Sequence, residues 1–556
     1  MVHRILERLT APVRGLHQAA YLLAALTFAS QILALLRDRT FAHSFGAGQT
    51  LDLYYAAFRV PDLVFALVSS LVSAYVLIPR ITGMDREEIA RLLSQSATFL
   101  LVVGGGICVL LAIWMPQFLA VLYPDLAASS MSSAFILTAR ILLLQPILLG
   151  LSGVLGSVTQ VHRRFTLFAL APVLYNLGII FGAIALYPRF GLPGIGAGVV
   201  LGAVLYALVN VPVVIEAGVF PRLALPRFSE MLPVVRDSVP RSLALGMGSV
   251  TALALTAIAS RLGTGAVSVF TLASNLEAVP LALVGSSYAV AAFPALSEAS
   301  TPEKREEFTR ILVASARHII LWSVVFLGLI VVLRAHLVRT ILGSGAFDWN
   351  ATRLTAALLA LLSIGLVAQG LVLLFSRALY AIRQSWRPLA YQLAGGAITV
   401  GLALICLSLS PATLAAWLRV PNVPDAAILF VALAASLGQI FLLVLSLVAL
   451  RSAAPGLASA LVRPLIDGLA AAAVGGAAAY GVLAILGGIA PLTSLAAVFT
   501  QGFIAGMVGL TASALTLYLL GNEEIRIIGR ALSRLIRAGR HGADVLAPSA
   551  EEPVQP

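Results

Sequence analysis

Apolar stretches of about 20 residues recur from residue 16 to residue 520, and each is long enough to cross a hydrocarbon core of about 30 Å as a helix. A bilayer offers the backbone no hydrogen-bond partners, so only helices and closed barrels can span it. Barrel strands alternate polar and apolar residues over about ten positions, whereas these stretches are continuously apolar. With 60% hydrophobic and only 11% charged residues, the sequence predicts an all-α polytopic membrane protein.

Proline, glycine and charge clusters divide the apolar stretches into fourteen predicted transmembrane helices. These helices cover residues 16–44, 54–80, 95–115, 132–158, 166–187, 193–216, 238–262, 266–296, 312–333, 354–380, 389–410, 426–450, 461–487 and 496–520.

The basic residues indicate the orientation of these helices. Most of the 36 Lys and Arg residues fall in every second connecting segment, as the positive-inside rule requires if both termini face the cytoplasm. The net charge of +12 is therefore explained by topology and by attraction to anionic lipid on the cytoplasmic face, without nucleic acid. We expect a multi-pass membrane protein that is a monomer.

An internal repeat is indicated by landmarks that return at an offset of about 217 residues. The order "FGAG", Pro61, Ser69–Ser70, Pro79 reappears as "LGTG", Pro280, Ser286–Ser287, Pro294. The offset corresponds to six helices, so the two copies are parallel repeats, which predicts two six-helix lobes around a central cavity. The last two helices are then an addition to the pair of lobes.

This organisation divides the chain into six segments. They are an amphipathic lead-in at 1–15, an N-lobe at 16–217, a cytoplasmic linker at 218–237, a C-lobe at 238–452, two extra helices at 453–520, and a basic amphipathic helix with a disordered tail at 521–556.

Six ionisable residues lie unexpectedly in or beside the first two spans: Arg37, Asp38, Arg39, Asp52, Arg59 and Asp62. A charged group near the bilayer centre costs about 2.5 to 3.5 kcal/mol on insertion scales, so it normally faces protein or an aqueous cavity. One interpretation is that these groups contact a substrate. The alternative is that they form internal ion pairs that hold the first two helices together, as their zero net charge suggests.

The stretch "QILALLRDRTFAHSFGAGQTLDLYYAAFRVPD" and the residues up to Pro79 resemble the signature of the MurJ (MviN) lipid II flippases. The matching features are the Arg37–Asp38 pair, the Phe-Gly-Ala-Gly turn, Asp52, and Arg59 followed by Pro61. A second segment, "FSRALYAIRQSWRPL", resembles the family's segment between helices 10 and 11.

The resemblance implies the fold of the multidrug/oligosaccharidyl-lipid/polysaccharide superfamily, with the last two helices forming a groove for a polyprenyl tail. It also implies transport of the peptidoglycan precursor lipid II, a polyprenyl-pyrophosphate-linked glycan, from the inner to the outer leaflet of the bacterial cytoplasmic membrane by alternating access. The substrate-binding residues expected on this basis are Arg37, Asp38, Asp52, Arg59 and Asn275.

The sequence departs from the family pattern at three positions. Family members place further arginines where this chain has Gln31, Phe65 and Asn275, so the cavity attracts a diphosphate less strongly. Asn275 can still donate hydrogen bonds, and Arg140 or Arg261 could contribute from the outer side.

Other functions remain open at this stage. Flippases for another polyprenyl-linked saccharide belong to the same superfamily, and so do cation-coupled drug antiporters, for which Asp38, Asp52 and Glu277 are candidate ion sites. A scaffold that no longer transports is a further alternative. The loops carry no catalytic or nucleotide-binding motif, which argues against an enzyme, and Cys108 and Cys406 lack metal-ligand spacing. We expect neither a cofactor nor a metal.

Overall fold

The computed structural model describes residues 16–223, 228–487, 494–522 and 524–525. All regular structure within these ranges is helical, as the sequence predicts. The predicted lead-in at 1–15 and nearly all of the predicted C-terminal helix and tail at 521–556 lie outside the described residues.

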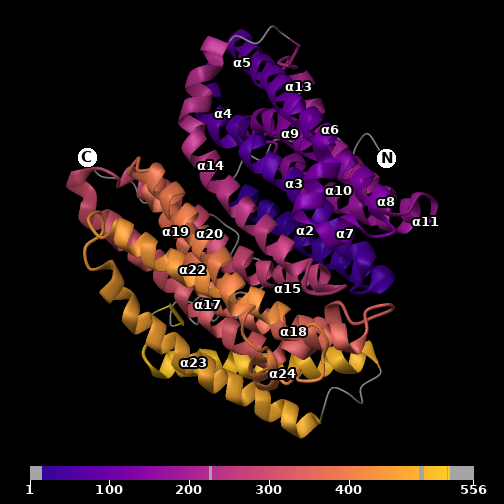
Figure 1. The fold of residues 1–556 in the computed structure, drawn as a ribbon. Coiled ribbons are helices and arrows are strands. Elements are labelled where there is room, and N and C mark those ends of the chain that lie inside the picture. Colours follow the sequence, from indigo (N-terminus) through magenta and orange to yellow (C-terminus); the bar gives the residue numbers. More distant parts are fainter. Residues whose placement is uncertain (1–15, 224–227, 488–493, 523, 526–556) are drawn as a thin grey trace, which may run out of the picture.

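The first half of the chain forms one group of helices, coloured indigo to purple in Figure 1. Its elements are α2 (Leu16–Phe45), α3 (Gln49–Leu67), η1 (Ser69–Val72), α4 (Ala74–Ile81), α5 (Arg86–Phe99), η2 (Leu100–Gly104), α6 (Gly105–Leu122), α7 (Pro124–Ala127), α8 (Ser132–Leu142), α9 (Leu144–Val161), α10 (Phe165–Phe181), η3 (Gly182–Leu186), α11 (Tyr187–Phe190), α12 (Leu192–Leu208) and α13 (Val211–Glu216).

The second half forms a second group, coloured magenta to yellow in Figure 1. Its elements are α14 (Phe228–Ala259), α15 (Ala266–Pro280), η4 (Leu281–Ser286), α16 (Ser287–Glu298), η5 (Pro302–Lys304), α17 (Arg305–Ile341), α18 (Trp349–Ile364), α19 (Leu366–Ala381), α20 (Trp386–Cys406), α21 (Ala412–Trp417), α22 (Ile428–Leu450), α23 (Leu457–Leu486) and α24 (Leu495–Leu519).

The predicted count of fourteen spans is not confirmed. Among the described residues, 12 helices are long and apolar enough to cross a membrane, or 13 if the pair α18 and α19, bent by 44°, is one span. The first predicted span coincides with α2, which is not among the twelve. Helix α14 begins at Phe228, and its membrane-spanning part, Ser238–Ala259, begins at the position where the predicted linker at 218–237 ends.

The two groups meet along α14 and α15, which pack against α3. Helix α14 also packs against α20, so it contacts both groups and runs between them in Figure 1. Helices α23 and α24 pack on each other and on α17, at the far side of the second group from α2 and α3. The apolar contacts there join the buried Leu321, Val325 and Leu329 of α17 to Ala471 of α23 and Ala505 of α24.

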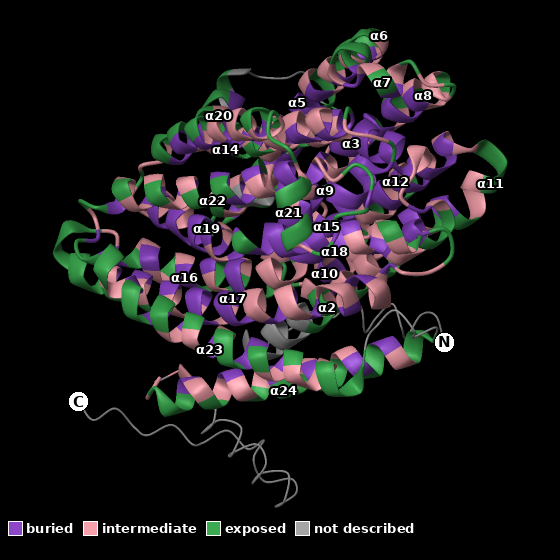
Figure 2. Cartoon of the chain, turned by 60° about the horizontal axis from the view of Figure 1, so that its bottom comes forward, coloured by how far each residue is buried: buried purple, intermediate pink, exposed green. Residues whose placement is uncertain are grey.

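Helices α23 and α24 are the least buried of the twelve spans, and Figure 2 shows exposed and intermediate residues along α24. Large apolar side chains such as Ile485, Phe499 and Phe503 are exposed on these two helices. An exposed apolar surface of this kind fits a helix pair that faces lipid.

Each of the two stretches that share the repeated landmarks contains an interruption of its helix. In the first copy α3 passes through Pro61 and breaks at the 3₁₀ turn η1, which contains Ser69. In the second copy Pro280 ends α15, and the π-helical turn η4 runs to Ser286. The shared serines therefore lie in or at the end of both interruptions. The interruption follows Pro280 directly, whereas in the first copy η1 begins only at Ser69, well after Pro61.

The glycine turns of the two copies lie against each other. Gly265 has a φ of +91°, and a Cβ at this position would lie 2.5 Å from the carbonyl oxygen of Ala47. Gly46 has a φ of +62°, and a Cβ there would lie 2.5 Å from the carbonyl oxygen of Ala346. A side chain at Gly265 would collide with the first turn and one at Gly46 with the segment after α17, so glycine allows the two groups of helices to meet at this end.

Candidate functional site

A cavity of about 340 Å³ lies among α2, α3, α9, α10 and α15. Three of the five predicted site residues, Arg37, Arg59 and Asn275, line this cavity together. The full lining is Arg37, Phe41, Tyr54, Tyr55, Phe58, Arg59, Asp62, Phe65, Gln145, Leu149, Tyr175, Ile179, Thr271 and Asn275.

Asp38 is not part of the lining but connects two of the lining residues, Arg37 and Asn275. Its carboxylate is 2% exposed, and Oδ1 lies 2.9 Å from both Nε and Nη2 of Arg37. The other oxygen, Oδ2, accepts a hydrogen bond of 3.0 Å from Nδ2 of Asn275. Arg37 also donates from Nη1 to Oδ1 of Asn176 on α10, at 3.2 Å. One polar network thus joins α2, α10 and α15.

This network explains how the charges are tolerated inside a membrane-spanning bundle. A buried carboxylate is stabilised when an opposite charge and hydrogen-bond donors replace its hydration. Asp38 has a guanidinium and an amide as partners, and the Arg37–Asp38 pair is neutral as a unit. Arg37 keeps part of its surface in the cavity, since its side chain is 21% exposed. A ligand can therefore reach the guanidinium.

Arg59 and Asp62 line the cavity from α3. Arg59 donates from Nε to the hydroxyl of Thr256 on α14, at 2.9 Å. Arg59 and Asp62 are three residues apart on α3, but they form no ion pair among those found in the described residues. Arg59 therefore links α3 to the second group of helices and presents the rest of its guanidinium to the cavity.

Asp52 belongs to α3 and does not line the cavity. Its carboxylate lies at the start of α15. Its carboxylate is 1% exposed and accepts hydrogen bonds from the backbone N–H of Gly265 at 2.5 Å and of Ser268 at 2.7 Å. The Ser268 hydroxyl donates to it as well, at 2.5 Å. The first N–H groups of a helix lack partners within the helix, and a carboxylate satisfies them well. This geometry favours a capping role, and substrate binding by Asp52 stays a prediction.

Arg39 caps the C-terminal end of a helix, whereas Asp52 lies at an N-terminal end. Its Nη1 donates to the carbonyl oxygens of Thr340 at 2.7 Å and Ile341 at 3.2 Å, at the end of α17. Nearby, the backbone N–H of Ala346 donates to the carbonyl of His43 at 2.9 Å. The end of α2 is therefore attached to the segment that follows α17.

These contacts show how the charged residues of the first two spans are paired in the structure. In the described part of the chain, no hydrogen bond or ion pair joins a charged group of α2 to one of α3. The charges connect α2 and α3 to α10, α14, α15 and α17 instead. Ion pairs between the first two helices are thus not found in the described residues, where Arg37 pairs with Asp38 on the same helix, and contact of these groups with a substrate stays a prediction.

The sequence did not lead us to predict four polar residues of the site. Asn176 bonds Arg37, and three buried atoms of the cavity lining have no hydrogen-bond partner: the hydroxyls of Tyr55 and Thr271 and Oε1 of Gln145. Buried polar atoms are normally paired, so unpaired ones beside a cavity indicate a place for water or ligand. An isolated amide in an apolar span was the available signal for Asn176 and Gln145.

The other residues considered from the sequence are placed as follows. Phe65 lines the cavity, whereas Arg140 donates to the carbonyl of Ala112 at 2.8 Å and is not part of the lining. Arg261 and Gln31 are also outside the lining. No three His, Cys, Asp or Glu side chains lie close enough to hold a metal ion in the part of the chain that is described.

Glu277 is buried on α15 and faces α19. It is 5% exposed, and its Oε1 accepts a hydrogen bond of 2.7 Å from Nε2 of Gln369. This pair is separate from the cavity that contains Arg37.

An apolar cavity of about 290 Å³ is lined in part by the same helices α2 and α15 as the polar one. Leu35 on α2 and Leu276 on α15 line it, close in sequence to Arg37 and Asn275 of the polar cavity. The rest of its lining comes from α15, η4, α17 and α18, and consists of Val279, Pro280, Leu283, Phe326, Leu329, Ile330, Leu333, Leu337, Ile341 and Leu359. Helices α2 and α15 thus contribute side chains to both a polar and an apolar cavity.

Long apolar helices arranged around a charged cavity define the class of protein as a polytopic membrane transporter. The chain belongs to the lipid II flippase MurJ family, because the model of the family described as "Lipid II flippase MurJ" matches residues 41–500.

Two relatives illustrate the similarity in sequence. The chain is 26% identical over 382 residues to the lipid II flippase MurJ of Burkholderia cenocepacia, with 66% of this chain and 73% of that protein covered. It is 27% identical over 385 residues to the probable lipid II flippase MurJ of Thermotoga maritima, with 68% of this chain and 77% of that protein covered.

Solved structures show the same fold. A structure described as lipid II flippase MurJ in an inward closed conformation superposes with a TM-score of 0.71 at 19% identity, covering 90% of this chain and 99% of that one. An inward-facing multidrug resistance MATE family transporter of the MOP superfamily superposes with a TM-score of 0.61 at 17% identity, covering 78% and 95%.

Proposed function

We propose that this protein carries lipid II, a polyprenyl-pyrophosphate-linked glycan, from the inner to the outer leaflet of a bacterial cytoplasmic membrane. The observation that carries the proposal is that Arg37, Arg59 and Asn275 line a single cavity inside the bundle. Diphosphates are bound by guanidinium groups and by neutral hydrogen-bond donors. The protein acts as a transporter and not as an enzyme, and both of its termini face the cytoplasm.

The polar and the apolar cavity match the two parts of such a substrate. The charged headgroup cannot cross hydrocarbon unaided because of its hydration, whereas a polyprenyl tail is soluble in lipid. Helices α2 and α15 each have both polar and apolar surfaces. The polar cavity is lined by Arg37 and Asn275, and the apolar cavity by Leu35 and Leu276. The headgroup occupies the first cavity, and the start of the tail lies toward the second.

The size of the polar cavity indicates that the two helix groups must move. Pockets for drug-sized ligands enclose about 300 to 1,000 Å³, and the cavity of about 340 Å³ is at the low end of this range. A headgroup with diphosphate, sugar and peptide parts needs more space. We infer that the contacts between the groups open in turn at the two ends of the molecule, which is alternating access.

A flippase for another polyprenyl-linked saccharide is the second candidate. Phe65 lines the cavity at a position where the family resemblance leads one to expect arginine, and it is 39% exposed. With Asp62 and Asp38 nearby, the site has little surplus positive charge. A substrate with fewer phosphate charges than lipid II would suit this site.

Complementation tests the proposal. The full chain is expressed in cells depleted of their own lipid II flippase, and lipid II accessible at the outer surface is assayed. We expect rescue by the wild type and by Arg310→Ala, an exposed arginine of α17 outside the cavity. Arg37→Ala should lose rescue at normal expression. Failure of the wild type in cells that make lipid II, with rescue in a strain lacking another saccharide flippase, would favour the second candidate.

A further inference from the structure

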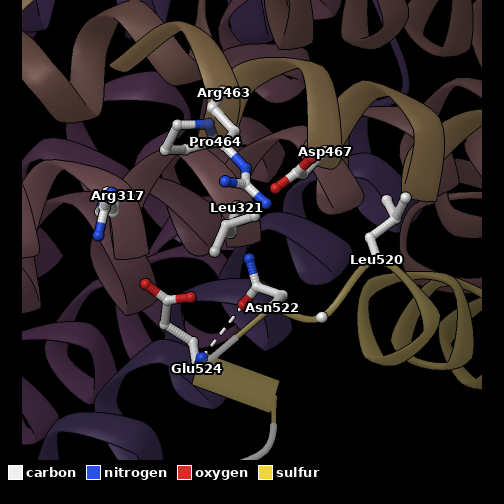
Figure 3. Close-up of a pocket in the computed structure, with 9 residues that line it drawn as sticks. Arg317, Leu321, Arg463, Pro464, Asp467, Leu520, Asn522 and Glu524 are labelled. Atoms are coloured by element: carbon white, nitrogen blue, oxygen red, sulfur yellow. Dashed lines mark hydrogen bonds between the residues drawn. The ribbon is translucent and has the colours of Figure 1, made fainter. Parts of the chain in front are cut away.

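A second polar pocket, of about 180 Å³, lies where α17 and α23 meet the chain that follows α24 (Figure 3). Arg317 enters it from α17, and Arg463 and Asp467 enter it from α23. Asn522 and Glu524 approach from the chain after α24. None of these residues belongs to the lining of the cavity around Arg37.

The pocket lies at the depth of lipid headgroups. Helix α24 ends at Leu519, directly before the residues that line the pocket. On α17, the stretch from Arg317 to Ile341 is about 36 Å long at 1.5 Å per residue, slightly more than a hydrocarbon core of about 30 Å. The pocket therefore opens at one membrane surface, which the distribution of basic residues predicts to be the cytoplasmic one.

The charges around the pocket are balanced but unpaired. Arg317 and Arg463 form no ion pair with a described residue, and Nε of Arg317 is buried without a hydrogen-bond partner. The same space is bordered by the carboxylates of Asp467 and Glu524. An unpaired buried donor costs free energy, so its presence beside a cavity points to a ligand that supplies the acceptor.

We propose that this pocket binds the headgroup of a phospholipid that carries both a phosphate and a primary ammonium. The phosphate lies against the guanidinium groups of Arg317 and Arg463, and the ammonium lies against the carboxylates of Asp467 and Glu524. Two carboxylates disfavour a headgroup that is only anionic, because its negative charge would meet theirs. A small headgroup also suits the volume of about 180 Å³.

The surroundings of the pocket accommodate the rest of such a lipid. Leu321 and Leu520 border the polar space, and Leu520 is 42% exposed. Acyl chains leaving the headgroup meet the exposed apolar surface of α23 and α24, which includes Ile466 and Leu519. The lipid would thus hold the ends of α23 and α24 against α17.

Native mass spectrometry of the purified full chain tests the proposal, with three lipids of identical acyl chains. Phosphatidylethanolamine has the primary ammonium, phosphatidylcholine keeps the phosphate but cannot donate from its quaternary ammonium, and phosphatidylglycerol has no cation. We expect phosphatidylethanolamine to bind about tenfold more tightly than either of the others, the effect of one charge-assisted hydrogen bond. Equal binding of all three, or tightest binding of phosphatidylglycerol, would overturn the proposal.

Variants separate the two halves of the pocket. Arg317→Ala should weaken phosphatidylethanolamine and phosphatidylcholine together, because both carry the phosphate. Glu524→Gln should reduce the preference between them, because only Asp467 is then left for the ammonium, and leave phosphatidylcholine binding unchanged. Arg310→Ala, on the same helix but outside this pocket, is the matched control and should bind like the wild type. Unchanged phosphatidylethanolamine binding by a folded Arg317→Ala protein would also contradict the proposal.

Discussion

The side-chain amide of Asn275 on α15 donates a hydrogen bond of 3.0 Å to the carboxylate of Asp38 on α2. The bond crosses between the two halves of the chain and ends on the carboxylate that also holds Arg37. Asn275 thus helps to position a guanidinium that it does not touch directly. A change at Asn275 is expected to act on the site through Asp38.

A carboxylate at position 275 should disrupt this arrangement. Asn275→Asp places a second carboxylate against Asp38, and the repulsion either separates α2 from α15 or draws Arg37 away from the cavity. We expect transport to fall by about tenfold or more, since about 1.4 kcal/mol corresponds to a factor of ten. Asn275→Arg should retain transport, because a guanidinium can donate to Asp38 as the amide does. Equal transport by both variants would separate Asn275 from the function of the site.

Asp52 should matter more for stability than for binding. Asp52→Ala removes three hydrogen bonds at the start of α15 and leaves buried N–H groups without an acceptor. We expect a loss of about 2 to 4 kcal/mol, seen as a lower melting temperature of the purified protein. Asp52→Asn should lose less, because its amide oxygen still accepts. Should Asp52→Asn keep its melting temperature but lose transport, substrate binding would be the better account of this residue.

The contrast between Asp52 and Arg37 shows how far the sequence can predict such a site. Hydropathy is a local property, so the sequence predicts the helices and marks both residues as charges that need a partner. Which group becomes the partner of each charge depends on tertiary packing. Nothing in the spacing of α3 indicates that the N–H groups of Gly265 and Ser268, more than 200 residues away, lie opposite Asp52. Asn176 was missed for the same reason.

The contact between Ser70 and Ser242 should report on opening of the two helix groups. Their hydroxyls are 2.7 Å apart and join η1 to α14. A Ser70→Cys/Ser242→Cys protein is therefore expected to cross-link under mild oxidation. If the groups separate here during transport, the oxidised protein should be inactive and reducing agent should restore its activity. Each single cysteine variant serves as a control for oxidation of the existing Cys108 and Cys406. Full transport by the cross-linked protein would show that this contact need not open.

Glu277 and Gln369 provide a test of cation coupling, the property that a drug antiporter would require. Gln369→Leu leaves the buried Glu277 carboxyl without its hydrogen bond, which should cost about 1 to 3 kcal/mol in stability. Removing both partners in Glu277→Leu/Gln369→Leu should recover most of this loss, because no buried polar group is then left unpaired. Thermal unfolding of the two purified variants measures the difference. If the pair is structural, the double variant should also transport normally in the complementation assay. A double variant that is as stable as the wild type but inactive would instead identify Glu277 as a coupling site. Loss of stability could not then explain the loss of transport.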